Sequence, residues 1–253
     1  MGRLFYRVIC GDCLEVMPTL DPESFALVVA DPPFNVHEKP LDRLEPLDWD
    51  VFPDLTEYAR FTVKWLTEVH RLLEPGGSCY VFWSQRWERL FYCIADCVLS
   101  RLDPPLKLVR ELAWVDYCQT WRFTSRYYLW NRTPVFYLVK SRDGKPKTFN
   151  ASFMARENVD TFVMPAPQSN WRKDRQYHPF QKPLRLVEIF VKNSSNPGDA
   201  VLDPFLGAGT TMLACIRLGR SCVGIEKSPE YCRIAQLRAR EMLARLRGRK
   251  PGA

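Results

Sequence analysis

The chain contains the segment Ala200-Val201-Leu202-Asp203-Pro204-Phe205-Leu206-Gly207-Ala208-Gly209-Thr210-Thr211, a short apolar run followed by two closely spaced glycines. The apolar run predicts a buried strand, and the glycines predict a tight turn at which the backbone can approach a ligand closely. Thr210 and Thr211 would open a helix, whose free N–H groups and dipole favour an anionic group. This order of strand, glycine turn and helix is typical of the ligand-binding edge of an open α/β sheet.

An acid follows at the position that a nucleoside site needs. Glu226 ends the next predicted strand, in Val223-Gly224-Ile225-Glu226, where nucleotide-binding sheets place a carboxylate that accepts both ribose hydroxyls. The alternative for Glu226 is a solvated acid at the end of a strand. No Gly-Lys-Ser/Thr follows the glycines, which argues against a nucleoside triphosphate site.

A second strand end carries residues suited to chemistry at an amino group. Asp31-Pro32-Pro33-Phe34 follows the apolar run Phe25-Ala26-Leu27-Val28-Val29-Ala30. An exocyclic amine on adenine or cytosine is a poor nucleophile, because its lone pair is delocalised into the ring. The Asp31 carboxylate and the Pro32 carbonyl can each accept one amine hydrogen and free that lone pair, while the prolines hold the turn and Phe34 stacks on the base. The alternative is a plain loop, since Asp-Pro commonly begins a turn.

Strand-like and helical segments alternate along most of the chain, which predicts a mainly parallel sheet with helices on both faces. Residues 108–115 and 135–139 are separated by an irregular aromatic stretch, so we expect them to form an antiparallel edge hairpin. Residues 141–181 lack periodicity and predict an inserted loop region. The other expected strands cover 4–9, 27–30, 78–83, 200–203 and 221–225, and the expected helices cover 54–73, 85–99, 183–194, 209–218 and 229–247, with Pro75-Gly76-Gly77 ending the first helix.

Length and composition fit an ordinary globular enzyme. The 253 residues suit one large α/β domain, and the net charge of +7 favours an anionic partner. The nine cysteines predict reduced and mostly buried thiols in a cytoplasmic protein without a signal peptide or a membrane span. Cys10-Gly11-Asp12-Cys13 has zinc-ligand spacing, but a zinc site needs two further ligands and the chain has three histidines. We therefore expect no metal.

Together these motifs resemble a known family. Asp203–Thr211, Asp31-Pro32-Pro33-Phe34 and His178-Pro179-Phe180-Gln181-Lys182-Pro183 are similar to motifs of the beta group of S-adenosylmethionine-dependent DNA amino-methyltransferases, the N4/N6 DNA methylase family. The resemblance covers about residues 5–36, 54–83 and 178–240. It implies a Rossmann-like methyltransferase sheet, mostly parallel with an antiparallel edge hairpin, and permuted so that the catalytic half precedes the cofactor half. It also implies a single methyltransferase domain over 1–253, with 141–177 as a short inserted target-recognition region.

The same resemblance implies a site for S-adenosylmethionine. Asp203 would meet the methionine amino group, Lys182 the carboxylate region, and Asp12 the adenine amino group. On sequence alone Asp12 could instead cap the short helix after it, Lys182 could be solvated, and His178 could be an ordinary loop histidine. Phe180 departs from the usual His-Pro-Thr-Gln-Lys-Pro pattern at its third position. The cofactor residues implied are Asp12, Cys13, His178, Lys182, Asp203, Phe205, Gly207, Gly209, Thr210, Thr211 and Glu226.

Double-stranded DNA is the expected partner. A base inside a duplex cannot reach the Asp31 turn, so we predict base flipping, with residues 35–52 as either a mobile lid or an ordinary surface loop. The expected DNA-binding residues are Arg122, Arg126, Arg172, Lys173 and Arg175. The basic and aromatic run that includes Arg122, Arg126, Arg132, Arg142, Lys145 and Lys147 suits either DNA contact or the packed hairpin. The short recognition region suggests a short site, a homodimer or a partner subunit, and the arginine-rich terminal helix suggests a solvated face.

The predicted function is site-specific DNA methylation in a restriction–modification setting. Asp rather than Ser at position 31 favours adenine N6 over cytosine N4, which is a tendency within the family. The alternatives are cytosine N4 methylation, methylation of an amine on RNA or protein, and an inactive DNA-binding subunit. Two intact motifs argue against the inactive subunit. They are the turn Asp31–Phe34, which we call the catalytic turn, and the turn Phe205–Gly209, which we call the glycine turn.

Overall fold

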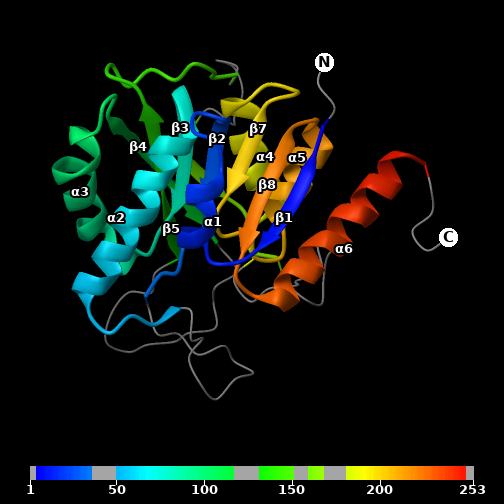
Figure 1. The fold of residues 1–253 in the computed structure, drawn as a ribbon, viewed down its shortest axis with the longest axis horizontal. Coiled ribbons are helices and arrows are strands. Elements are labelled where there is room, and N and C mark those ends of the chain that lie inside the picture. The colour runs from blue at the N-terminus through cyan, green and yellow to red at the C-terminus, as the bar shows by residue number, and fades with distance from the viewer. Residues whose placement is uncertain (1–3, 36–49, 117–130, 151–158, 168–180, 249–253) are drawn as a thin grey trace.

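The computed structural model describes residues 4–35, 50–116, 131–150, 159–167 and 181–248. These residues form one eight-stranded sheet in the order β1-β8-β7-β2-β3-β5-β4-β6 (Figure 1). The strands are β1 Tyr6–Cys10, β2 Phe25–Ala30, β3 Leu73–Phe82, β4 Leu106–Val115, β5 Arg132–Lys140, β6 Thr161–Val163, β7 Ala200–Asp203 and β8 Ser221–Glu226.

Five neighbouring strands, from β1 to β3 in sheet order, run parallel to one another. Cys10 pairs with Glu226 across β1 and β8, and Ala30 pairs with Val81 across β2 and β3. Because parallel strands end on the same side of a sheet, the residues that follow these five strands share one edge. We call this edge the carboxyl edge.

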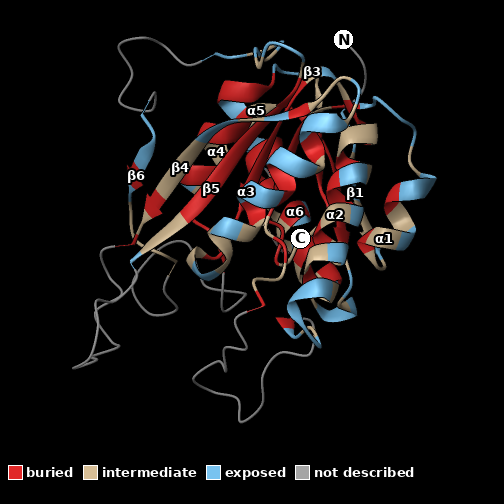
Figure 2. Ribbon diagram, turned by 90° about the vertical axis from the view of Figure 1, so that its left-hand side faces the viewer, coloured by how far each residue is buried: buried red, intermediate tan, exposed pale blue. Residues whose placement is uncertain are grey.

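Helices cover both faces of the sheet. The helices are α1 Cys13–Val16, α2 Leu55–Leu72, α3 Glu88–Cys97, α4 Leu184–Ser194, α5 Thr210–Leu218 and α6 Pro229–Leu246. Trp65 of α2 and Phe91 of α3 belong to one hydrophobic cluster, whereas Phe190 of α4 and Met212 of α5 belong to a second cluster. The central strands are therefore buried on both faces, which explains why they are apolar runs rather than alternating ones (Figure 2).

The predicted α/β order and the parallel sheet are confirmed, and three local predictions were wrong. The helix expected over 54–73 forms as α2, but the strand expected over 78–83 begins at Leu73. Pro75-Gly76-Gly77 therefore lie in β3, where its register with β2 shifts, and not in a turn that ends the helix. The helix expected over 85–99 divides into α3 and two flanking 3₁₀ turns, Gln85–Trp87 and Leu99–Arg101. Strand β6 lies within the expected loop region and pairs outside β4, because a three-residue strand carries too little periodicity to be seen in the sequence.

The cysteines and helices of the described ranges add three findings. No disulfide joins the eight cysteines there, of which Cys10, Cys93 and Cys97 are exposed and five are buried. No group of three or more His, Cys, Asp or Glu side chains in those ranges is arranged to hold a metal ion. Of the helices in the described ranges, none has the length and apolar character needed to cross a membrane.

Candidate active site

Four acids lie in a row along the carboxyl edge. Glu226 ends β8, Asp203 ends β7, Asp12 follows β1 by two residues, and Asp31 directly follows β2. These four strands are neighbours in the sheet, in the order β1, β8, β7, β2 (Figure 1). The acids at their ends therefore follow the order Asp12, Glu226, Asp203, Asp31. A row of this kind favours a cationic ligand.

The glycine turn lies between the second and third acids of this row. The Gly207 N–H donates to Glu226 Oε2 at 2.8 Å, and the Leu206 N–H donates to the Ile225 carbonyl at 2.8 Å. Gly209 has a φ of 88°, and a Cβ at this position would lie 3.0 Å from the Cβ of Ala235. Backbone conformation and helix packing therefore both require glycine at this position.

Asp203 is almost completely buried beneath this turn. One of its oxygens, Oδ1, accepts from the Phe205 N–H at 2.9 Å, and the Thr211 hydroxyl donates to the same carboxylate. Burial, with smaller contributions from Asp31 and Glu226, raises the pKa of Asp203 to about 7, against the hydrogen bonds that lower it. Near neutral pH, this carboxyl group can therefore take up or release a proton in response to a bound cation.

Glu226 and the start of α5 complete the turn. Besides Gly207, the Glu226 carboxylate accepts from the Ser228 N–H at 2.7 Å, and burial raises its pKa against these backbone hydrogen bonds. No side chain caps the N-terminus of α5, which begins at Thr210 after Gly209. Both threonines at this end, Thr210 and Thr211, are buried. An uncapped helix N-terminus next to a glycine turn is a favourable position for an anionic group.

Asp12 caps α1, which is one of the two interpretations that the sequence allows for this residue. Its Oδ1 accepts from the Leu14 N–H at 2.9 Å, and its Oδ2 lies 3.0 Å from Lys227 Nζ. Burial acts to raise the pKa of Asp12, but the Leu14 N–H and Lys227 outweigh it and hold the pKa below its ordinary value. The neighbouring Cys13 thiol lies in the core, where burial raises its pKa to about 12, so the thiol stays neutral.

The turn that begins at Asp31 is held by hydrogen bonds from distant parts of the chain. The Tyr58 hydroxyl of α2 donates to the Pro33 carbonyl at 2.9 Å, and the Trp87 indole N–H donates to the Asn35 carbonyl at 3.1 Å. The Asn35 N–H donates to Asp50 Oδ1 at 2.7 Å. Asn35 has a φ of 51°, a left-handed conformation that asparagine tolerates better than most residues. The turn is therefore constrained from three directions.

Lys182 reaches the same turn from the start of α4. Its Nζ lies 2.5 Å from Asp31 Oδ2, and it also lies 5.2 Å from the ring centroid of Phe34 and 5.3 Å from that of Phe82. The Lys182 side chain is 9% exposed and that of Asp31 is 28% exposed. Burial raises the pKa of Asp31, and the Lys182 charge and hydrogen bond act in the opposite direction.

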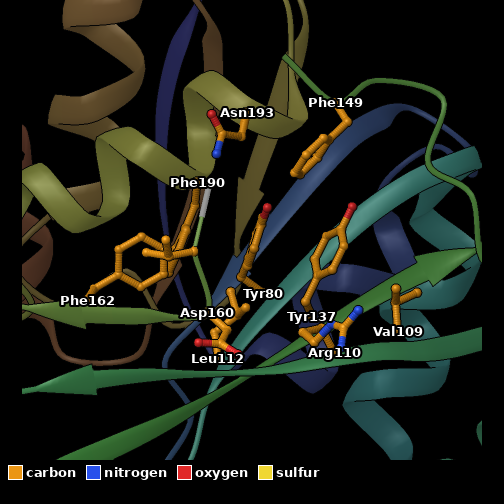
Figure 3. Close-up of a pocket in the computed structure, with 11 residues that line it drawn as sticks. Tyr80, Val109, Arg110, Leu112, Tyr137, Phe149, Asp160, Phe162, Phe190 and Asn193 are labelled. Carbon is orange, nitrogen blue, oxygen red and sulfur yellow. The ribbon is translucent and has the colours of Figure 1, made fainter. Parts of the chain in front are cut away.

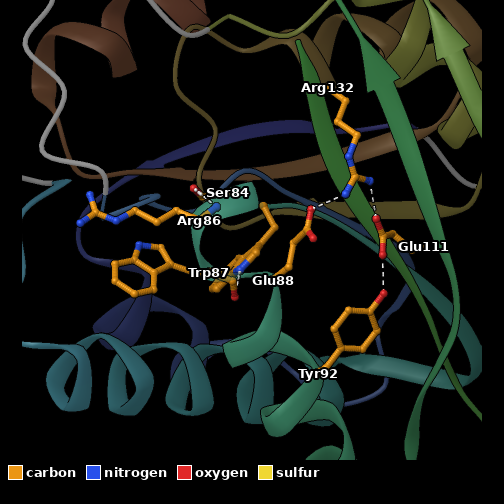
Figure 4. A network of polar contacts seen from close by, with 8 residues as sticks. Ser84, Arg86, Trp87, Glu88, Tyr92, Glu111 and Arg132 are labelled. Atoms are coloured by element: carbon orange, nitrogen blue, oxygen red, sulfur yellow. Dashed lines mark hydrogen bonds and ion pairs between the residues drawn. The ribbon is translucent and has the colours of Figure 1, made fainter. Parts of the chain in front are cut away.

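The segment after β3 carries Arg86, Trp87 and Glu88, of which Trp87 contacts the catalytic turn. Arg132 of β5 pairs with Glu88 at 2.9 Å and with Glu111 at 2.7 Å, and Glu111 also accepts from the Tyr92 hydroxyl (Figure 4). Arg86 extends away from this network over the Trp87 ring, with its guanidinium carbon 5.0 Å from the centroid. Arg86 is exposed, and within the described ranges no acid pairs with it.

A pocket of about 520 Å³ lies elsewhere, over the sheet face that α4 partly covers. Tyr80 there stacks on Phe190 with centroids 4.3 Å apart and on Tyr137 with centroids 4.8 Å apart (Figure 3). Asn193, Arg110 and Asp160 are among its polar lining residues. None of the site residues predicted from the sequence, within the described part, lines this pocket, so it is separate from the row of acids.

Comparison with known proteins decides the family. The family model described as DNA methylase, for N6 and N4 amino-methyltransferases, matches residues 25–237. The chain belongs to the N6/N4 DNA methylase family. The match includes both the catalytic turn and the glycine turn.

Curated relatives and solved structures agree with this family. The chain is 29% identical to the type II methyltransferase M.HpaI of Haemophilus parainfluenzae, covering 92% of this chain and 73% of the relative. It is also 29% identical to the type II methyltransferase M.HinfI of Haemophilus influenzae, and that match covers 93% of this chain and 68% of the relative. The fold is similar to that of the M1.HpyAVI complex with S-adenosylmethionine, with a TM-score of 0.69 at 24% identity, covering 92% of this chain and 98% of that chain. The fold is also similar to that of the cytosine-N4-specific PvuII DNA methyltransferase, with a TM-score of 0.72 at 20% identity, and the match covers 97% of this chain and 95% of that chain.

S-adenosylmethionine is the methyl donor of N6/N4 DNA methylases, and the residues at the carboxyl edge fit its chemistry. The molecule carries a sulfonium, an ammonium, a carboxylate and a nucleoside. The row of acids matches the two cations, and the uncapped start of α5 matches the carboxylate. A Cβ placed on Gly207 would meet no atom within 4 Å, so the turn presents bare backbone to open space.

Most predicted site residues of this N6/N4 methylase are brought together, and others cannot be assessed. Asp31 to Phe34, Lys182 and the cofactor residues from Asp203 to Glu226 all lie along the carboxyl edge. The residues outside the described ranges are His178, of the cofactor set, and all five predicted DNA-binding residues, Arg122, Arg126, Arg172, Lys173 and Arg175. The described members of the basic run pair with acids instead: Arg132 with Glu88 and Glu111, Arg142 with Asp103, Lys145 with Asp143 and Lys147 with Glu74.

Sequence reasoning missed several residues that hold the site. Tyr58, Asp50 and Trp87 hold the catalytic turn, and no pattern in their segments distinguishes them from core or loop residues. Arg238 of α6 donates to the Ala208 carbonyl of the glycine turn, a contact that the prediction of a solvated face for the terminal helix does not include. These contacts join segments far apart in the chain, so local sequence carries no signal for them.

Proposed function

We propose that this DNA amino-methyltransferase transfers the methyl group of S-adenosylmethionine to the N6 amine of a flipped adenine in double-stranded DNA. The observation that carries the proposal is the carboxylate at position 31, at the carboxyl end of β2 and beside the predicted cofactor residues. Within the family, Asp at this position favours adenine. The similarity to the cytosine-N4-specific PvuII enzyme is at 20% identity and concerns the fold alone.

The catalytic turn supplies two hydrogen-bond acceptors and one ring. Asp31 Oδ1 and the Pro32 carbonyl each accept a hydrogen bond from the target amine, which shifts the nitrogen towards tetrahedral geometry and frees its lone pair. As the C–N bond forms, the carbon–sulfur bond of the donor breaks and leaves a thioether, and the methylated nitrogen then loses one proton along its hydrogen bond to the Asp31 carboxylate. Phe34 stacks on the extruded base. The hydrogen bond from Tyr58 to Pro33 fixes the turn before the base arrives, so little reorganisation is needed at the moment of reaction.

The remaining acids hold the methyl donor. When bound, the donor supplies an electrophilic methyl group on its sulfonium. Asp203 would bind the methionine ammonium, Glu226 would accept hydrogen bonds from the ribose hydroxyls, and Asp12 would approach the adenine amino group while still capping α1. The N–H groups at the start of α5 would bind the methionine carboxylate. Position and electrostatics are the protein's contribution to the reaction.

Arg86 is the described residue best suited to the DNA side of the site. It is exposed, follows β3 at the carboxyl edge, and rests over Trp87, whose indole holds the catalytic turn. A guanidinium with no acidic partner in the described ranges is available for a phosphate oxygen. Arg86 therefore adds a phosphate contact to those expected of Arg122, Arg126, Arg172, Lys173 and Arg175.

The test is methyl transfer from labelled S-adenosylmethionine to mixed-sequence duplex DNA, followed by mass spectrometry of the nucleosides. The Asp31→Asn protein, which keeps the shape of the side chain, is the background control. We expect label in N6-methyladenine. Label in N4-methylcytosine would keep the reaction and correct the base, whereas label in RNA or protein but not in DNA would overturn the proposal.

A further inference from the structure

The ion pair between Lys182 and Asp31 joins two residues that the sequence assigns to different halves of the site. Their separation along the chain is 151 residues, and their contact of 2.5 Å is made at Asp31 Oδ2. Asp31 Oδ1 has no partner among the described residues. The contact therefore uses one oxygen of the catalytic carboxylate and leaves the other for a ligand.

The surroundings of Lys182 hold its ammonium in place. The ammonium lies about equally far from the rings of Phe34 and Phe82, and its side chain is 9% exposed. Pro183 directly follows and forms the N-cap of α4, which fixes the backbone on that side. A lysine held in this way binds a carboxylate in one orientation rather than as a freely moving surface charge.

We propose that Lys182 is a positioning residue for the catalytic carboxylate: it binds Asp31 Oδ2 so that Oδ1 is directed to the amine of the target base. This inference rests on the proposed transfer of a methyl group to DNA. It differs from the role implied by the family resemblance, in which Lys182 binds the carboxylate region of the methyl donor. To take that role, Lys182 would have to leave Asp31 as a partly buried charge without a counter-ion, which is unfavourable.

The ion pair has a consequence for the pH dependence of the reaction. Asp31 accepts an amine hydrogen bond much more strongly when it is ionised. Among the described residues, the ionisable groups that interact with it are Lys182 and Asp203. Removing the Lys182 charge and hydrogen bond leaves burial unopposed, so the pKa of Asp31 rises further. In a variant without the Lys182 charge, the acidic limb of the pH–rate profile for methyl transfer therefore moves to higher pH.

Three variants test the role of Lys182. In Lys182→Met, we expect kcat to fall on the order of 10²-fold, the acidic limb to move to higher pH, and the affinity for S-adenosylmethionine to change little. Lys182→Arg keeps the charge, so its acidic limb should remain near that of the wild type. Lys107→Met removes an exposed lysine from β4 and controls for the loss of one positive charge. A large loss of cofactor affinity in Lys182→Met, with an unmoved acidic limb, would overturn the inference.

A thermal-unfolding cycle tests the pair without any methyl transfer. Asp31→Asn, Lys182→Met and the double variant are compared with the wild type in the absence of DNA and cofactor. We expect the two single substitutions to be non-additive, because each removes the same contact. Additive changes in Tm would overturn the inference. If the wild type methylates no DNA yet the cycle is non-additive, the proposed function fails while the pairing stands.

Discussion

The glycine turn and the catalytic turn lie at the ends of neighbouring strands, yet they are held in different ways. The glycine turn after β7 is fixed mainly by backbone groups of the next strand and by Glu226 at the end of that strand, with one contact from a more distant side chain, Arg238 of α6. The catalytic turn after β2 is fixed by side chains of Tyr58, Trp87 and Lys182, which come from three separate segments.

Because they are held differently, the glycine turn and the catalytic turn should be sensitive to different substitutions. A turn held by its own backbone and a neighbouring strand depends mostly on the glycines and acids within its motif. A turn held by distant side chains is sensitive to substitutions that touch neither cofactor nor base.

Asp31→Ala separates the two halves of the site. We expect kcat to fall on the order of 10³-fold, because the substitution removes the charged acceptor for the target amine. The affinity for S-adenosylmethionine, measured by calorimetry, should stay within a few-fold of the wild type. A comparable loss of cofactor affinity would contradict the separate roles of the two turns.

The pKa of Asp203, raised to about 7, makes cofactor binding depend on pH. In the free protein this carboxyl is protonated below that value, and a bound ammonium favours its ionised form, so binding releases a proton. Affinity should therefore weaken by up to about tenfold for each unit of pH below 7 and level off above it. Calorimetry in buffers of different ionisation enthalpy measures this proton release.

Asp203→Asn is the control for that measurement. The amide cannot ionise, so the proton release below pH 7 should disappear even though cofactor binding is weaker throughout. Unchanged proton release in this variant would assign it to another group at the carboxyl edge.

Tyr58→Phe tests whether the catalytic turn depends on a distant hydroxyl. The substitution removes the hydrogen bond to the Pro33 carbonyl but keeps the stacking of the ring on Trp83. We expect kcat to fall roughly 5- to 10-fold, corresponding to about 1 kcal/mol for one hydrogen bond, with little change in cofactor affinity. Tyr92→Phe removes a hydroxyl bonded to Glu111, outside the turn, and is the matched control. Equal effects of the two substitutions on kcat would remove the contrast between the turns.

Arg86→Ala tests the proposed contact between Arg86 and a DNA phosphate. Loss of one phosphate contact should weaken DNA binding at every sequence and reduce the slope of log affinity against log salt by about 1. Arg101→Ala removes the same charge from the 3₁₀ turn beyond the far end of α3. Fluorescence anisotropy over a range of salt concentrations compares the two variants, and identical slopes would place Arg86 outside the DNA contact.

The sequence predicted the parallel sheet and the positions of the two turns, because both depend on local patterns. Apolar runs of strand length ending in Asp31-Pro32-Pro33 or in Asp203 followed by glycines require no knowledge of what packs beside them. Strand β6 was missed because its three residues take their conformation from pairing with β4 rather than from their own pattern. The role of Asp12 as a cap was one of two readings, and local sequence could not choose between them.

Local sequence sets which residue types lie at the strand ends, namely the acids, the glycines and the prolines. Their chemistry and backbone preferences are properties of single residues and their neighbours in the chain. Which side chains meet at these strand ends depends on the folded arrangement of the whole chain. Tyr58 reaches Pro33 across 25 residues and Lys182 reaches Asp31 across 151 residues. Such contacts depend on the order of strands in the sheet and on the helices that pack on each face. That arrangement is set by burial summed over the whole core, so no short segment of the chain encodes it.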